Sequence, residues 1–454
     1  MQMPRRVLYS LRPIHARDKV RDNFFSCIYI VQTYPTRCYI LVSGQVSVMI
    51  TMEEAINLVM GATALIACEQ VGFVDALGRV LAEDVVSDID MPPFHKATMD
   101  GYAVIGADID GAREDSPVVL EVIEEIPAGS VPTMDLTSGK ASRIMTGAPV
   151  PAGADTVVMI EDTTTDSGGK KVSILASNPS SNNIAPLGED VRKGHVVLNS
   201  GSRLRPPEIG ILAAVGKVDV KIHRQPIVGI ISTGSEIVEP HNAPKVGQIR
   251  NSNGYSMAAQ IVSAGARAKY LGIVADDPGA LQEVIFRGLK DCDIVLLSGG
   301  VSAGLYDLVQ GAMKACGVTV QFDRIKMKPG KPLTFGTRNE KLIFGLPGNP
   351  VSSVVGLELL VYPAIRKMQG FSELYHQKVK GFLRDDFEQV PGRKQYVPAR
   401  TVQEKGQWHT SWVGHHGSAD LFSLAGANSL FVVESETQRL DAGSEVEIVL
   451  IAGW

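Results

Sequence analysis

Four segments of the chain combine glycine, serine or acidic residues at points where an apolar stretch ends or a helical pattern begins. They are residues 232–236 (STGSE), 276–278 (DDP), 298–307 (SGGVSAGLYD) and 346–350 (LPGNP). A glycine-rich loop before a helix presents backbone N–H groups and the positive end of the helix dipole, which together favour phosphate. A single loop of this kind is more often structural, but its recurrence predicts a site for a phosphorylated ligand.

Acidic side chains lie on the same segments, at Glu236, Asp276 and Asp307. Mg²⁺ prefers oxygen ligands and typically takes one or two carboxylates together with water and substrate phosphate. We therefore expect Mg²⁺ as a cofactor, with a helix cap or a solvated charge as the alternative for each residue. For Asp277 the helix cap is the preferred interpretation.

Residues 328–332 (KPGKP) form a basic counterpart, in which prolines stiffen the segment that carries Lys328 and Lys331. A tetrahedral oxyanion or a phosphate would suit this corner. A lysine-bearing hairpin turn is the alternative interpretation, and the spacing alone leaves both open.

Three turn-like segments in the N-terminal half also offer polar side chains, at Asp100, Thr146 and Asp190. They are residues 91–103 (MPPFHKATMDGYA), 143–153 (RIMTGAPVPAG) and 188–192 (GEDVR). Surface turns are the default interpretation of these segments when they are considered alone.

The elements that must position these residues follow from hydrophobic periodicity. Apolar runs at residues 227–231, 268–274, 293–297, 318–322 and 342–345 alternate with helical patterns at residues 253–263, 278–290, 306–316 and 350–369. Strands that are apolar throughout indicate a parallel sheet with helices on both faces. Right-handed crossovers then bring the loops after the strands to one edge, where such folds bind ligands. Helix starts are predicted from three pairs of residues: Thr51 with Glu54, Asp277 with Pro278, and Asn349 with Pro350.

The remainder of the chain has shorter strands. Runs such as residues 118–126 and 156–160 are separated by glycine and proline turns, and the tail from residue 377 again shows short strands. The predicted fold class is α/β plus β: a multidomain chain with a central, doubly wound, mostly parallel sheet, β-rich N-terminal modules and a small C-terminal β module.

Composition excludes several classes of protein. The 454 residues carry a formal net charge of −5, which argues against nucleic-acid binding because phosphate neutralisation needs a basic surface. The five cysteines form no C-x-x-C pair, so we expect a reducing, cytoplasmic compartment. The apolar stretch at residues 24–31 is far shorter than the roughly 20 residues of a membrane helix, so no membrane association is expected.

We expect translation to begin at Met49 or Met52; a genuine N-terminal arm is the alternative.

Five collinear motifs resemble the molybdopterin molybdenumtransferases, the family of MoeA and the C-terminal domain of gephyrin. The motifs are residues 92–103 (PPFHKATMDGYA), 144–151 (IMTGAPVP), 298–307 (SGGVSAGLYD), 328–332 (KPGKP) and 346–352 (LPGNPVS). The resemblance runs from about residue 52 to the end of the chain. It implies a central molybdopterin-binding-like domain and a small C-terminal β-barrel. The implied boundaries are an extension at residues 1–51, domain I at 52–94 and 185–225, domain II at 95–184, domain III at 226–375 and domain IV at 376–454.

The resemblance also implies an activity: molybdate is inserted into adenylylated molybdopterin, AMP is released and Mg²⁺ assists. It implies a homodimer whose cleft is completed by the N-terminal module of the partner, with the molybdopterin adenylyltransferase and recipient molybdoenzymes as further candidate partners. The family's catalytic positions correspond to Asp100, Thr146, Asp190, Glu236, Asp276 and Asp307, the last three also as metal ligands. Its substrate-binding positions correspond to Ser298, Gly299, Gly300, Ser302, Lys328, Lys331, Pro347, Pro350, Ser352 and Ser418.

The chain departs from the usual family pattern at four positions: Ser235 and Asn251 replace aspartates, Arg324 replaces a lysine and Pro398 replaces an arginine. Two rival functions stay open. The central domain alone also resembles molybdopterin adenylyltransferases and CinA-type nucleotide hydrolases, and a gephyrin-like domain can serve as a non-catalytic scaffold. The sequence does not distinguish between molybdate and tungstate as the physiological anion.

Overall fold

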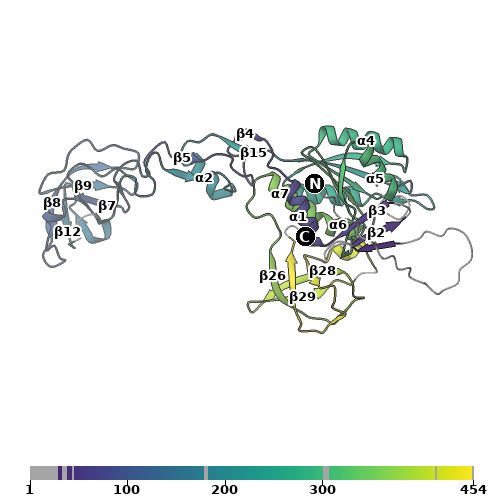
Figure 1. Ribbon diagram of the computed structural model, residues 1–454. Coiled ribbons are helices and arrows are strands. Elements are labelled where there is room, and N and C mark those ends of the chain that lie inside the picture. Colours follow the sequence, from purple (N-terminus) through teal and green to yellow (C-terminus); the bar gives the residue numbers. More distant parts are fainter. Residues whose placement is uncertain are drawn as a thin grey trace, which may run out of the picture. The chain divides into compact units, whose positions relative to one another are not determined.

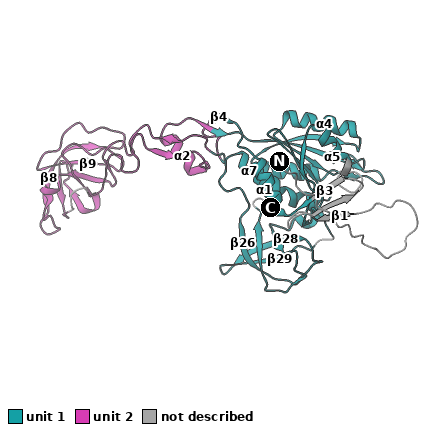
Figure 2. Cartoon of the chain, viewed as in Figure 1, with its two compact units in different colours: residues 1–69, 78–80, 222–454 teal, residues 70–77, 81–221 magenta. Residues whose placement is uncertain are grey.

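The computed structural model describes residues 29–32, 38–42, 45–177, 182–299, 306–414 and 417–451, with the backbone alone for residues 29–48, 306 and 307. The chain divides into two compact units, which Figure 2 shows in different colours. Unit 1 comprises residues 1–69, 78–80 and 222–454, and unit 2 comprises residues 70–77 and 81–221. Gly300 and Ser302 lie outside the described residues.

Unit 1 is built around a six-stranded sheet in the order β19-β16-β20-β25-β24-β21. Figure 1 shows the ribbon of the chain, coloured along the sequence. The first four strands are parallel: β19 (Arg267–Val274), β16 (Ile227–Thr233), β20 (Ile294–Ser298) and β25 (Lys341–Leu346). The predicted apolar runs are therefore the strands of a doubly wound α/β domain, as expected.

Alternation along each central strand sends neighbouring side chains into two separate cores. In β20, Ile294 and Leu296 join one core, whereas Val295 and Leu297 join the other. The first core receives α3 (Asn253–Ser263), α1 (Met52–Ala62), α6 (Pro350–Gly356) and α7 (Tyr362–Met368), and the second receives α4 (Pro278–Asp291) and α5 (Tyr306–Ala315). Burial on both faces explains why these strands lack a polar side, and it confirms the predicted covering of the sheet by helices.

The far edge of the sheet differs from the prediction. The run at residues 318–322 forms β21 (Thr319–Phe322), but it is an antiparallel edge strand next to β24 (Thr334–Arg338), which the sequence analysis did not predict. β24 folds back on β25 as a hairpin through a turn at Asn339, which has a positive φ of 52°. A hairpin partner is antiparallel by geometry, so the parallel pattern ends there.

All three predicted helix starts are confirmed, and two of the three N-cap residues also cap the helix with their side chains. Thr51 and Glu54 form a reciprocal capping box at α1, and Asp277 accepts a hydrogen bond from the N–H of Ala280 at the start of α4. Asn349 is the N-cap residue of α6 but makes no side-chain cap. The helix that follows continues through a π-helical turn, residues 357–361, before α7.

The C-terminal part of unit 1 is a small closed barrel. Its five strands are β26 (Lys378–Leu383), β28 (Lys394–Glu404), β29 (Gln407–Trp412), β30 (Ser429–Val433) and β32 (Glu445–Leu450). Closure comes from the pairing of β28 with β30, and β28 also pairs in parallel with β23 (Met327–Lys328). This strand pairing joins the barrel directly to the lysine-bearing segment of the α/β domain.

Shorter elements of unit 1 are α8 (Leu421–Leu424), β17 (Ile237–Val238), β18 (Ile249–Arg250), β22 (Arg324–Ile325), β27 (Phe387–Glu388) and β31 (Arg439–Leu440).

Unit 2 contains a second six-stranded sheet, in the order β10-β7-β9-β8-β12-β11. Its strands are β7 (Gly101–Val104), β8 (Val118–Ile126), β9 (Lys140–Ile144), β10 (Thr156–Met159), β11 (Thr163–Thr165) and β12 (Lys171–Ile174). Two-stranded sheets pair β13 (Ile184–Ala185) with β6 (Lys96–Ala97) and β14 (Val196–Leu198) with β5 (Val85–Val86), next to helix α2 (Pro206–Ala214). The β-rich, turn-rich character expected for this region is confirmed.

Two further sheets complete the described elements. β4 (Cys68–Gly72) pairs with β15 (Asp219–His223), and the backbone strands β1 (Tyr29–Gln32), β2 (Cys38–Val42) and β3 (Gln45–Ile50) form a sheet with β22. None of the described helices is long and apolar enough to cross a membrane. The hypothesis of a start at Met49 or Met52 and the predicted domain boundaries remain predictions.

Asp293 anchors the central sheet where β20 begins. Its carboxylate accepts two hydrogen bonds from the Arg224 guanidinium at 2.7 Å each and one from the backbone N–H of Ile227 at 2.9 Å. Burial raises the pKa of Asp293, but the hydrogen bonds from Arg224 and Ile227 outweigh it, so the pKa lies below its ordinary value of 3.8. Lys341, at the start of the neighbouring strand β25, adds an ion pair at 3.2 Å.

We predict that Asp293→Asn lowers the free energy of unfolding by about 2 kcal/mol near neutral pH, because Arg224 and Lys341 lose a buried, charged acceptor. The folded-state pKa of Asp293 is lowered, so this stabilisation is complete above 3.8 and is lost as the pH falls through the lowered pKa. Urea unfolding at neutral and acidic pH measures both effects. Asp291→Asn, which removes an exposed ion pair with Lys269, is the matched control and should change little. Equal effects of the two substitutions would contradict the prediction.

Candidate functional site

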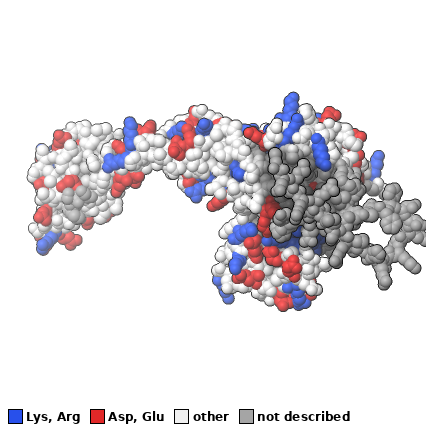
Figure 3. Space-filling view, in the orientation of Figure 1, with Lys and Arg blue, Asp and Glu red and all other residues white. Residues whose placement is uncertain are grey.

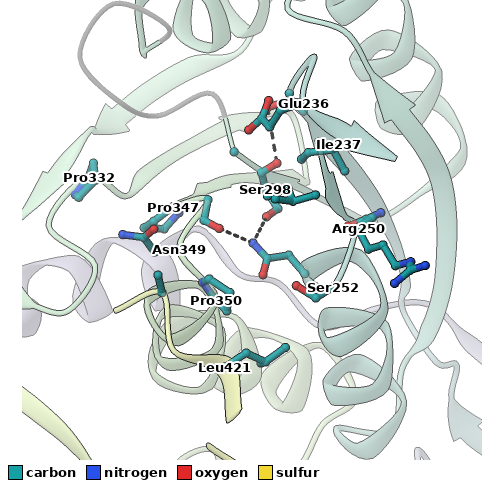
Figure 4. A pocket seen from close by; sticks show the side chains of 18 of the residues that line it. Glu236, Ile237, Arg250, Ser252, Ser298, Pro332, Pro347, Asn349, Pro350 and Leu421 are labelled. Carbon is teal, nitrogen blue, oxygen red and sulfur yellow. Dashed lines mark hydrogen bonds between the residues drawn. The ribbon is translucent and has the colours of Figure 1, made fainter. Parts of the chain in front are cut away.

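A cavity of about 600 Å³ opens at the carboxyl ends of the parallel strands of unit 1 (Figure 4). Its lining includes the ends of β16 and β20, the start of α6 and part of the segment after β29. Among the predicted site residues it contains Glu236, Ser298, Gly299, Pro347 and Pro350. The parallel topology therefore brings together segments that lie more than a hundred residues apart in the sequence.

Asn253 connects two of the predicted loops across this cavity. Its Nδ2 donates to the Ser298 hydroxyl at 2.9 Å and to the carbonyl oxygen of Gly348 at 2.7 Å, as Figure 4 shows. Ser298 itself is buried, 2% exposed. Asn253 thus holds the loop after β20 and the loop after β25 at a fixed separation.

Gly299 is required by its surroundings. Its φ is +100°, and a Cβ atom there would lie 2.3 Å from the carbonyl oxygen of Thr233. The N–H of Gly299 donates to the carbonyl oxygen of Leu346 at 3.2 Å. Gly299 therefore allows the β16 and β20 loops to approach closely, and its own N–H is already used within the protein.

Glu236 is the carboxylate that lines the cavity, whereas Asp276 lies outside the lining and contacts the neighbouring residue Ser235. Asp276 Oδ2 accepts a long hydrogen bond of 3.4 Å from the N–H of Ser235, whereas Asp276 Oδ1 is buried without a hydrogen-bond partner among the described residues. A buried carboxylate oxygen without a partner fits a cation ligand. No group of three or more metal-ligating side chains occurs within the described part of the chain, and the side chain of Asp307, in α5, is outside that part.

A second cavity, of about 360 Å³, adjoins the first and shares Pro332, Pro347 and Asn349 with it. It is lined by the predicted residues Lys328, Lys331, Pro347, Ser352 and Ser418. A third cation, Arg393, completes the lining, and no aspartate or glutamate is present among the lining residues. This excess of positive charge in a confined space favours an anion with several oxygens.

Ser418 closes the second cavity from the side of the C-terminal barrel. Its hydroxyl accepts a hydrogen bond from Asn349 Nδ2 at 2.8 Å, and its carbonyl oxygen accepts one from the N–H of Val351 at 3.1 Å. These contacts explain why Asn349 does not cap α6 with its own side chain. The start of α6 is instead held by a segment of the barrel.

Asp100, Thr146 and Asp190 belong to unit 2 and line neither of these two cavities. The Asp100 Oδ1 atom accepts hydrogen bonds from the backbone N–H and from the hydroxyl of Thr146, both at 2.7 Å. Those two bonds lower the pKa of Asp100. Asp190 is exposed and lies on the wall of a separate, largely apolar cavity of unit 2.

Sequence reasoning did not identify Arg393 and Gln395, which line the second cavity. The available signal was weak: two polar residues two positions apart at the start of a strand that has several other polar residues. Their contact with the lysine segment depends on the pairing of β23 with β28, in which Lys328 is opposite Gln395.

The structure gives Asn251 a role that explains one departure from the family pattern. Its Oδ1 accepts hydrogen bonds from the Ser232 hydroxyl and from the N–H of Gly254, and its Nδ2 donates to the Tyr270 hydroxyl at 2.8 Å. Tyr270 in turn donates its only proton to Glu239 at 2.8 Å. A carboxylate at position 251 could not donate to Tyr270, so the amide fits this network and an aspartate would not.

Comparison with known proteins identifies the family. Residues 50–216 match the model described as "MoeA N-terminal region (domain I and II)", residues 229–367 match "Probable molybdopterin binding domain" and residues 380–451 match "MoeA C-terminal region (domain IV)". The molybdopterin molybdenumtransferase of Bacillus subtilis (strain 168) is 35% identical over 404 residues, which are 88% of this chain and 94% of that protein. The protein of the same name from Nostoc sp. is 37% identical over 380 residues, 82% of this chain and 86% of that protein.

A solved structure agrees with these relatives. The crystal structure of the molybdopterin biosynthesis MoeA protein from Pyrococcus horikosii has a TM-score of 0.77 at 33% identity and covers 89% of this chain and 100% of that chain. The fold and its two adjoining cavities define a multidomain protein built around a doubly wound α/β domain. With the matches above, the chain belongs to the MoeA family of molybdopterin molybdenumtransferases.

We predict that Thr146→Val raises the pKa of Asp100 toward its ordinary value of 3.8, because the hydroxyl donor is lost while the backbone donor remains. Carboxyl titration by NMR measures this pKa directly. Thr146→Ser keeps the hydroxyl and is the matched control, for which no change is expected. An unchanged pKa in Thr146→Val would show that the hydroxyl does not stabilise the Asp100 carboxylate.

Proposed function

We propose that the protein is a transferase that inserts molybdate into adenylylated molybdopterin and releases AMP in the biosynthesis of the molybdenum cofactor. The observation that carries the proposal is the pair of adjoining cavities, one glycine-rich and one cationic, which share Pro332, Pro347 and Asn349. The substrates are chemically matched to this pair. Adenylylated molybdopterin contains phosphate groups close to its two sulfurs, and molybdate is a tetrahedral dianion.

The cationic cavity would hold molybdate. Lys328, Lys331 and Arg393 line it from two elements that are joined by strand pairing. Charge-assisted hydrogen bonds from such groups to oxyanions are about twice as strong as neutral ones. Fixed cations of this kind keep the anion at a constant position while the sulfurs of the second substrate approach it.

The glycine-rich cavity would hold the phosphates of the adenylylated substrate. Glu236, which lines the cavity, and Asp276, which accepts a hydrogen bond from Ser235, the residue before Glu236, would hold Mg²⁺ there, with Asp307 as a third candidate from α5. The buried Asp276 Oδ1 is the supporting observation. Bound Mg²⁺ would neutralise phosphate charge during release of AMP. The hydrogen bonds of Asn253 fix the loops around these phosphates.

Catalysis by position and charge suffices for this reaction. The sulfurs of the substrate are the nucleophiles that bind molybdenum, so no protein side chain needs to form a covalent intermediate. Holding both substrates in adjoining cavities converts their encounter into an effectively intramolecular step, and the surrounding cations stabilise the charge on the anion.

We further propose a homodimer in which Asp100, Thr146 and Asp190 act on the substrate bound by the partner subunit, as the family resemblance implies. Asp100 supports this role because its carboxylate is exposed on unit 2 and is held by Thr146. A cytoplasmic location and hand-over from a molybdopterin adenylyltransferase to recipient molybdoenzymes belong to the same proposal. Of the described cysteines, Cys68, Cys292 and Cys316 are free thiols, which is compatible with a reducing compartment.

The rival functions are less well supported. Matches to the MoeA N-terminal and C-terminal regions flank the molybdopterin binding domain on both sides. An adenylyltransferase or a CinA-like hydrolase would require only the central domain. A purely structural scaffold would not need Lys328, Lys331 and Arg393 in one confined cavity, where their charges repel one another.

We predict that purified protein, incubated with adenylylated molybdopterin, molybdate and Mg²⁺, releases AMP, and that Lys331→Ala lowers the rate about 100-fold at low molybdate because one charged anion contact is lost. Chromatographic quantification of AMP measures the rate, and added tungstate tests competition between the two anions. Lys326→Ala is the control, since Lys326 lies outside both cavities. In a parallel incubation with free molybdopterin, ATP and Mg²⁺, adenylylation with release of pyrophosphate, but no AMP release in the first assay, would favour the adenylyltransferase. Absence of both reactions would favour the scaffold.

The proposed sharing of the site between subunits makes a separate prediction. Asp100→Ala and Lys331→Ala should each be nearly inactive, but refolding or co-expressing them together should restore about a quarter of the wild-type rate. Half of the dimers would be mixed, and each mixed dimer would contain one intact site. Activity of the mixture that equals the sum of the separate variants would contradict a shared site.

A further inference from the structure

Gln395 has a buried side chain that the protein itself does not satisfy. The residue is 5% exposed, and its Oε1 atom has no hydrogen-bond partner among the described residues. A buried polar atom without a partner destabilises a protein, so such atoms are uncommon and point to a missing ligand or water. This residue lines the cationic cavity.

Its place in the fold directs it toward the anion site. Gln395 is the second residue of β28, and its register partner on β23 is Lys328. Arg393, the residue before β28, also lines the cavity, and its guanidinium donates to the carbonyl oxygen of Met327 at 3.4 Å. The barrel therefore presents one cation and one neutral amide to the two lysines of the α/β domain.

We propose that Gln395 is a substrate-contacting residue that donates a hydrogen bond from its amide to an oxygen of a tetrahedral oxyanion held by Lys328, Lys331 and Arg393. The terminal amide carries a donor and an acceptor at nearly equivalent positions, and rotation about its last torsion exchanges them. A donor is then available to an unprotonated oxygen. The inference rests on the proposed function for the identity of the anion as molybdate.

The amide also bears on specificity. Its neutrality preserves the excess of three positive charges, because the described residues that line the cavity include no carboxylate. A glutamate at the same position would keep the shape, remove the donor and place a negative charge beside the anion. Gln395 is therefore the residue at which a small chemical change most directly alters the attraction of the cavity for a dianion.

The test uses the full-length protein and titrates sodium molybdate, and separately sodium tungstate, by isothermal calorimetry without any pterin. Gln395→Met, which keeps the approximate volume, is expected to weaken anion binding about 10- to 100-fold, and Gln395→Glu is expected to weaken it further. Thermal unfolding should show that Gln395→Met is at least as stable as the wild type, because a buried polar atom without a partner is removed.

Gln389→Met is the matched control. Gln389 is also a buried glutamine of the C-terminal part, 8% exposed, with an Oε1 atom that lacks a partner, but it does not line the cavity. Its substitution should leave anion affinity unchanged, even though the Nε2 hydrogen bonds to Glu434 and Thr437 are lost.

The outcomes separate this inference from the proposed function. Folded Gln395→Met and Gln395→Glu variants with wild-type affinity would overturn the inference, as would a wild-type protein that binds neither anion. In the AMP-release assay, Gln395→Met should raise the KM for molybdate and keep kcat, whereas a purely structural role would not raise that KM selectively. Anion binding that depends on Gln395 without any AMP release would support the inference and reject the proposed function.

Discussion

Burial of the central strands on both faces is the constraint on which the rest of unit 1 depends. Because β16, β20 and β25 bury alternate side chains in two different cores, they have no polar side on which to place functional groups. Polar residues can appear only where the strands end, and parallel pairing puts those ends at one edge. The loop residues Thr233, Ser298 and Pro347 meet there for this reason, and the first cavity forms between them.

The second cavity depends on a different kind of contact. Pairing of β23 with β28 attaches the closed barrel to the lysine-bearing segment, and Ser418 attaches the barrel to the start of α6. One cavity therefore draws its cations from two parts of the chain, Lys328 and Lys331 from the α/β domain and Arg393 from the barrel. Three cations and no carboxylate are among its described lining residues, whereas the cavity beside it is lined by one carboxylate, Glu236, and one cation, Arg250.

Departures from the family pattern acquire physical explanations at some positions and not at others. Asn251 donates to Tyr270, whose proton is directed to Glu239, and burial together with Glu239 raises the pKa of that tyrosine. A carboxylate at position 251 has no proton to donate to the Tyr270 hydroxyl, so that hydrogen bond would be lost. Ser235 contributes its backbone N–H to Asp276, a contact that any residue could make. Nothing in the structure explains Pro398, which lies within β28.

Local patterns in the sequence determined much of this protein. Apolar runs predicted the strands, and the Thr51–Glu54 and Asp277–Pro278 pairs predicted helix starts. Short motifs and their order predicted the family. Each run, pair and motif is made of residues that are close together in the chain. The hairpin partner β24 and the antiparallel edge were not predictable in this way. Neither were the roles of Arg393 and Gln395, since two polar residues on a strand acquire meaning only from what the strand pairs with. Tertiary structure alone decided that the barrel would face the lysines, because strand pairing and cavity walls are made by residues distant in sequence.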